Sequence, residues 1–68
     1  MYRLRIREVA ESKGINMSKL SRMSDVSFST IKRLFRNPHE PVGIDTLHKI
    51  AKELGVPTSE LIIDEPEK

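Results

Sequence analysis

Residues 17–36 read MSKLSRMSDVSFSTIKRLFR, and this stretch decides the fold. Its apolar spacing predicts two short helices, at about 17–24 and 28–36, joined by a link that is brief enough only for a tight turn. Ser27 is the expected N-cap of the second helix, because its hydroxyl can accept a hydrogen bond from an amide of the first turn. Asp25 is expected in the left-handed backbone region, which Asp tolerates better than most residues.

The segment 28–36 has two different faces on a helical wheel. Its apolar arc holds candidate core residues, namely Ile31, Leu34 and Phe35. The opposite arc is polar and basic, and it consists of Ser29, Lys32, Arg33 and Arg36. Phe28 lies between the two arcs, and two orientations stay open: it folds back onto the core beside Ile31, or it is exposed beside the basic arc.

Further helices are expected on both sides of this pair. The first spans about 3–13, and Gly14 is its stop, since glycine adopts the left-handed cap conformation without steric cost. After the pair, the Pro- and Gly-containing stretch 37–43 is a predicted loop. The segment 44–54 then has the cleanest amphipathic pattern in the chain.

A last short helix is expected at about 58–63, and residues 64–68 are predicted to be an acidic, frayed tail. The fold class is therefore all-α: a compact five-helix bundle in one domain, residues 1–63. The 68 residues include no cysteine, which removes disulfides and thiolate metal ligands. No apolar run approaches the roughly 20 residues that span a bilayer, and no signal-peptide pattern is present, so a cytoplasmic location is expected.

The net charge of +2 is unevenly distributed along the chain. Residues 1–36 carry nine Lys or Arg against three acids, whereas residues 37–68 carry three Lys against seven acids. Such a polarity suits a protein that offers one face to a polyanion. Two short helices with a tight turn, the second basic on its outer face, are the helix-turn-helix signature. The second helix of that motif enters the major groove of DNA, which is about 12 Å wide.

The chain resembles a known family over about residues 5–63: the Cro/Xre-type, lambda-repressor-like helix-turn-helix domains. The segments that carry the resemblance are Ile6-Arg7-Glu8-Val9, Lys13-Gly14-Ile15, Leu20-Ser21, Asp25-Val26-Ser27-Phe28-Ser29-Thr30-Ile31 and Asp45-Thr46-Leu47-His48-Lys49-Ile50-Ala51-Lys52-Glu53-Leu54-Gly55-Val56. The resemblance implies a compact five-helix bundle that binds operator DNA in transcriptional control, in a prokaryote or a phage.

Three positions depart from the family pattern. Met17 stands where members usually carry a Gln that contacts a phosphate and steadies the first base-reading side chain. Ser21 and Asp25 stand where the family prefers Ala and Gly. Both fit sterically, and replacing the glycine implies a small backbone cost.

The expected partner is double-stranded DNA, and the candidate contacts fall into two groups. The residues expected nearest the base edges are Ser27, Phe28, Ser29 and Lys32. The residues expected at phosphates are Met17, Ser18, Lys19, Arg22, Arg33, Arg36, Asn37 and His39. A weak or DNA-induced homodimer is also expected, through the edge of the helix 58–63, Leu4 or the loop 38–43.

The sequence gives little support for an enzymatic function. His39 and His48 have no nucleophile or metal ligand at helical spacing, and there is no Gly-rich phosphate loop, so no cofactor or metal is expected. The rival hypothesis is an antitoxin or adaptor that uses the same fold to bind a protein partner through its acidic C-terminal half.

Overall fold

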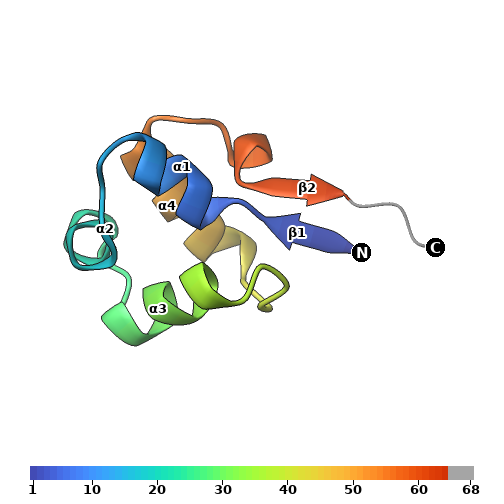
Figure 1. Cartoon of the computed structure of the whole chain (residues 1–68), viewed down its shortest axis with the longest axis horizontal. Coiled ribbons are helices and arrows are strands. Elements are labelled where there is room, and N and C mark those ends of the chain that lie inside the picture. The colour runs from blue at the N-terminus through green and yellow to red at the C-terminus, as the bar shows by residue number, and fades with distance from the viewer. Residues whose placement is uncertain (65–68) are drawn as a thin grey trace.

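Four α-helices and a small two-stranded sheet make up the part of the chain, residues 1–64, that the computed structural model describes (Figure 1). The elements in chain order are β1 (Tyr2–Leu4), α1 (Ile6–Ser12), α2 (Met17–Ser24), α3 (Phe28–Arg36), α4 (Ile44–Leu54), the 3₁₀ turn η1 (Thr58–Glu60) and β2 (Ile62–Asp64). The bounds of α2, α3 and α4 coincide with the ranges expected from the sequence. Of the predicted acidic tail, residues 65–68 lie outside the described residues.

The expectation of a mostly helical domain is confirmed, but the fifth helix at 58–63 is wrong. The chain after Pro57 makes a single 3₁₀ turn and then becomes extended. Ile62 and Ile63 are β-branched residues, which favour strands. They find a partner in β1: the two strands pair antiparallel, with Arg3 opposite Ile63 and Leu4 opposite Ile62.

The same sheet corrects the start of the first helix, which begins at Ile6 and not at residue 3. Residues 2–4 are extended because they pair with β2, and the amide of Arg5 donates to the carbonyl of Leu61 at 2.7 Å. Leu4 is consequently a core residue, only 2% exposed. Its proposed role in a dimer surface is therefore wrong.

One apolar core joins all the elements. Its buried members come from β1, from each of the four helices and from the residue after η1, and they are Leu4, Ile6, Val9, Ala10, Leu20, Ile31, Leu34, Leu47, Ile50, Ala51, Leu54 and Leu61. They occupy the apolar arcs of the helices, so periodicity alone indicates most of them. A helix long and apolar enough to cross a membrane is absent from residues 1–64.

The strand β1 also ties the N-terminal segment to the loop that follows α3. The Leu4 amide donates to the Pro38 carbonyl at 2.7 Å, and the Tyr2 hydroxyl donates to the Glu40 carbonyl at 2.7 Å. β1 therefore lies between β2 on one side and residues 38–40 on the other. This contact holds the end of α3 against the body of the domain.

Two apolar residues near the end of the described chain differ in burial and should therefore differ in their contribution to stability. Leu61 is fully buried, whereas Ile63 is 40% exposed. We expect Leu61→Ala to lower the free energy of unfolding by about 2–5 kcal/mol, because it leaves a cavity. Ile63→Ala should cost less than about 1 kcal/mol. Urea denaturation followed by circular dichroism measures both, and equal losses would contradict this packing.

Candidate nucleic-acid interface

The helices α2 and α3 form the helix-turn-helix, and buried side chains fix how they cross. Leu20 of α2 and Ile31 of α3 are both fully buried in the shared core. Figure 1 shows α2 end on and α3 lengthwise, so the two axes cross steeply. The N-cap of α2 is Asn16, whose side-chain oxygen accepts a hydrogen bond from the Lys19 amide at 2.8 Å.

The turn between them has the conformation that the sequence predicts. Asp25 lies in the left-handed region, with φ 57° and ψ 31°, and is the one non-glycine residue of the described chain with a positive φ. One serine hydroxyl bridges the turn, and another bonds back to the last turns of α2. The Ser21 hydroxyl donates to the Val26 carbonyl at 2.6 Å, and the buried Ser24 hydroxyl donates to the Leu20 carbonyl at 2.6 Å. The small residue at position 21 thus provides a hydrogen bond across the turn.

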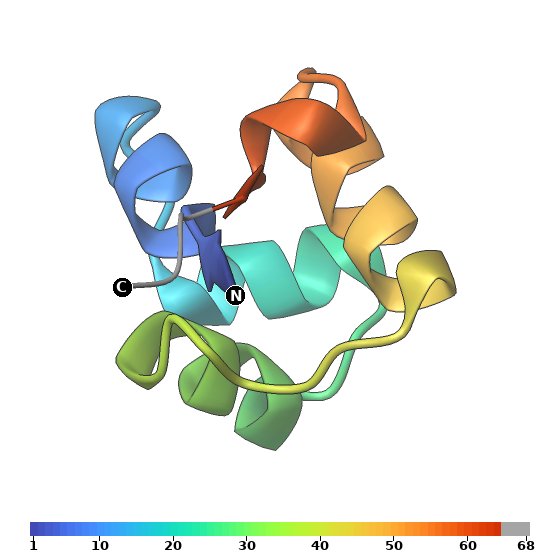
Figure 2. The same ribbon diagram turned by 90° about the vertical axis from the view of Figure 1, so that its right-hand side faces the viewer.

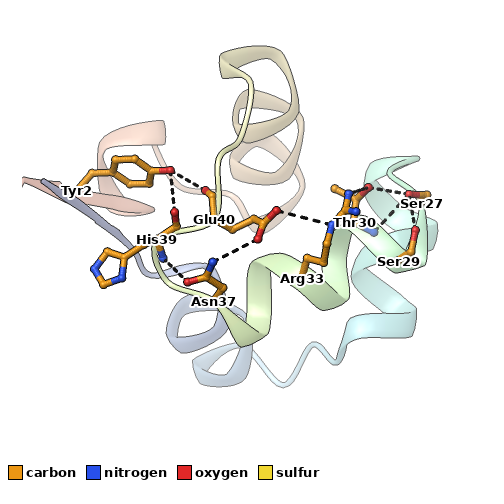
Figure 3. A network of polar contacts seen from close by, with 8 residues as sticks. All are labelled: Tyr2, Ser27, Ser29, Thr30, Arg33, Asn37, His39 and Glu40. Atoms are coloured by element: carbon orange, nitrogen blue, oxygen red, sulfur yellow. Dashed lines mark hydrogen bonds and ion pairs between the residues drawn. The ribbon is translucent and has the colours of Figure 1, made fainter.

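The N-terminus of α3 carries a cluster of hydroxyl groups, drawn at the right of Figure 3. The Ser27 hydroxyl donates to the Thr30 hydroxyl at 2.8 Å and accepts from the Thr30 amide at 3.4 Å, so Ser27 is the N-cap that the sequence predicts. Its oxygen also lies 3.4 Å from that of Ser29. Hydroxyls of this kind can both donate to and accept from base edges or phosphates.

Phe28 belongs to the exposed side of α3. The two orientations left open by the sequence differ in burial, and the side chain is 44% exposed while Ile31 and Leu34 fill the core beneath it. An aromatic side chain is therefore available at the first residue of the helix. It stands next to the hydroxyl cluster of Ser27 and Ser29.

The remaining outer face of α3 is basic. Lys32, Arg33 and Arg36 are all exposed. Arg33 lies 3.7 Å from the Glu40 carboxylate, whereas Lys32 and Arg36 have no acid within ion-pair distance among residues 1–64. Cations without a protein partner leave their charge available to an external anion.

The other predicted phosphate contacts lie on α2 and in the loop after α3. Ser18, Lys19 and Arg22 are exposed on α2. Met17, in contrast, is half-buried and packs on the core, so its side chain supports the fold. It also lines a hollow of about 440 Å³ at the flank of the basic face, together with Arg7, Glu11, Gly14, Ile15, Asn16, Phe35 and Arg36.

Asn37 and His39 continue the chain beyond α3. The Asn37 side chain accepts from the His39 amide at 3.0 Å and donates to the Glu40 carboxylate at 3.3 Å, so it organises the loop. The position of Glu40 beside Arg33 is what sequence reasoning missed. In the sequence, Glu40 is only one of the acids of the C-terminal half. No local pattern links it to Arg33, because the loop conformation brings the two together.

Within residues 1–64, no group of His, Asp and Glu is placed to hold a metal.

The left-handed turn makes a prediction about stability. Most non-glycine residues in this region cost about 1–2 kcal/mol relative to glycine, and Asp costs less than most. Asp25→Gly should therefore raise the free energy of unfolding by about 0.5–1 kcal/mol, after the added flexibility of the unfolded chain is deducted. Asp25→Ala is the matched control and should lower it, because Ala lacks the polar side chain that eases this conformation. Thermal denaturation of both variants checks the sign, and a destabilised glycine variant would contradict the assignment.

Comparison with known proteins agrees with this geometry. A family model described as Cro/C1-type HTH DNA-binding domain matches residues 5–67, which includes every element from α1 onward. No curated protein matches the chain closely enough to count as a relative. A match of this extent decides the family: the chain belongs to the Cro/C1-type helix-turn-helix DNA-binding domains.

Proposed function

We propose that this domain is a transcriptional regulator that binds double-stranded DNA in a sequence-specific manner, with α3 in the major groove. The observation that carries the proposal is the outer face of α3, where an exposed aromatic and a hydroxyl cluster adjoin three cations, two of which, Lys32 and Arg36, meet no acid within residues 1–64. A groove element needs both features, because base contacts specify a site and phosphate contacts position the protein on it.

The base-reading group consists of Ser27, Phe28, Ser29 and Lys32 at the N-terminal half of α3. Phe28 can pack on the 5-methyl group of thymine, and Lys32 can donate to the O6 and N7 acceptors of guanine. The two serines can donate or accept and so discriminate weakly. This set favours a site with at least one thymine opposite the start of the helix.

A second group of residues, proposed to bind phosphates, flanks the base-reading group. Arg33 and Arg36 extend from α3, while Lys19 and Arg22 extend from α2. Ser18, Asn37 and His39 are polar neighbours at the edges of this face. Met17 takes part only through its backbone amide at the N-terminus of α2, where the helix dipole favours an anion.

A single module of this kind buries roughly 600–1,000 Å² of protein surface on DNA. We therefore propose that two copies bind a pseudo-palindrome with half-sites about one helical turn apart, as a dimer that is weak without DNA. With Leu4 buried, the surfaces left for that contact are β2 and the loop 38–43.

The basic face is tested by the triple variant Lys32→Ala, Arg33→Ala, Arg36→Ala. Affinity for duplex DNA should fall about tenfold or more, and the slope of log affinity against log salt should fall by about 2, because each phosphate contact contributes about 0.9. The double variant Lys49→Ala, Lys52→Ala, on the exposed side of α4, is the control and should change neither value by as much. Fluorescence anisotropy at several salt concentrations measures both. Affinity that survives the triple change, or wild-type binding that is absent or independent of salt, would instead favour the protein-interaction module.

The role of Phe28 is tested by selecting bound sites from a random duplex pool. Phe28→Ala should lose a thymine preference that the wild type shows, at a cost of about 1–3 kcal/mol at that base pair. Ser29→Ala should change the selected motif less. Identical motifs for the wild type and Phe28→Ala would assign specificity to other residues.

A further inference from the structure

Glu40 is held in place by its neighbours in the loop after α3. Its carbonyl accepts the Tyr2 hydroxyl at 2.7 Å, and its amide donates to the Asn37 carbonyl at 3.1 Å. Its carboxylate accepts from the Asn37 side-chain amide at 3.3 Å. Figure 3 shows how these contacts lead from the N-terminal strand to the flank of α3. The side chain is only 24% exposed and so has a defined position.

The carboxylate held in this way faces Arg33. One oxygen of Glu40 lies 3.7 Å from the Nε atom of Arg33, and an Nη atom of the same guanidinium donates to the Thr30 hydroxyl at 3.5 Å. The guanidinium is thus placed along α3 between an acid and a hydroxyl (Figure 3). Of the three cations on this face, Arg33 is the one that meets an acid within residues 1–64.

We propose that Glu40 competes with DNA phosphate for Arg33 and thereby weakens the binding of this domain to any duplex. The inference rests on the proposed function. A carboxylate and a phosphate make the same kind of contact with a guanidinium, through two parallel hydrogen bonds. The Nε edge of Arg33 can serve one of them at a time.

The ion pair between Arg33 and Glu40 is weak enough for a phosphate to replace the carboxylate. Arg33 is 63% exposed and the contact is long, and exposed ion pairs of this kind are weak. A phosphate presented by the groove can therefore take the guanidinium, while Glu40 stays behind because the backbone contacts with Tyr2 and Asn37 anchor it. Glu40 acts as a positioning residue, and its effect is independent of DNA sequence because Arg33 is directed at phosphate.

Glu40→Gln is the variant that tests this inference. Glutamine keeps the length of the side chain and an oxygen that can accept from Asn37, and it leaves the carbonyl contact with Tyr2 unchanged. We expect affinity for a random-sequence duplex at low salt to rise about two- to fivefold, the range that corresponds to a weak exposed pair. The salt dependence should become steeper. Glu60→Gln, an equal change of net charge in η1, is the matched control and should give a smaller gain.

A double-mutant cycle separates competition from a general charge effect. In an Arg33→Gln background, most of the gain from Glu40→Gln should disappear, because the contested cation is gone. A gain that is the same in both backgrounds would overturn the inference. Thermal denaturation of each variant shows whether it is folded at the temperature of the binding measurement.

A second comparison leaves Glu40 intact. Arg33→Gln should cost less DNA affinity than Arg36→Gln, since Arg36 meets no acid within residues 1–64 that DNA would have to displace; an equal or larger loss would overturn the inference. A wild type that binds no duplex would overturn the proposed function itself. A wild type that binds duplex with no gain in Glu40→Gln would overturn only the competition.

Discussion

The crossing of α2 and α3 is the constraint on which the rest of the structure depends. It is set by two kinds of interaction at once: the burial of Leu20 and Ile31 in one core, and the left-handed backbone at Asp25. Together with the hydrogen bond of Ser21 across the turn, they hold the outer face of α3 away from the body of the domain, which a groove-binding helix requires.

A domain of this size has little surface to bury, and its stability is correspondingly marginal. The two-stranded sheet extends the core with two strands of only three residues each. By pairing β1 with β2, it buries Leu4 and Leu61 and brings Tyr2 to the loop after α3. Figure 2 shows that loop running beneath the N-terminus and along α3 toward α4. The elements that complete the core thus also support the candidate interface.

The folded structure places charges together that lie in different halves of the sequence. The basic half of the sequence includes the face of α3, as a polyanion-binding protein would need. The acidic half is not only exposed to solvent, because the loop after α3 places its Glu40 beside Arg33 on the flank of that helix. In the proposed function, attraction to DNA and restraint of one cation therefore arise on the same surface.

The sequence by itself determined α2, α3 and α4, most of the core and the position of the left-handed turn, because these depend on periodicity and on local backbone preferences. Residues 58–63 illustrate the limit. Their apolar pattern fits one turn of helix as well as a strand, and the choice depended on a partner about sixty residues away in β1. Tertiary structure alone likewise decided that Phe28 is exposed and that Glu40 meets Arg33, since packing and loop closure set both.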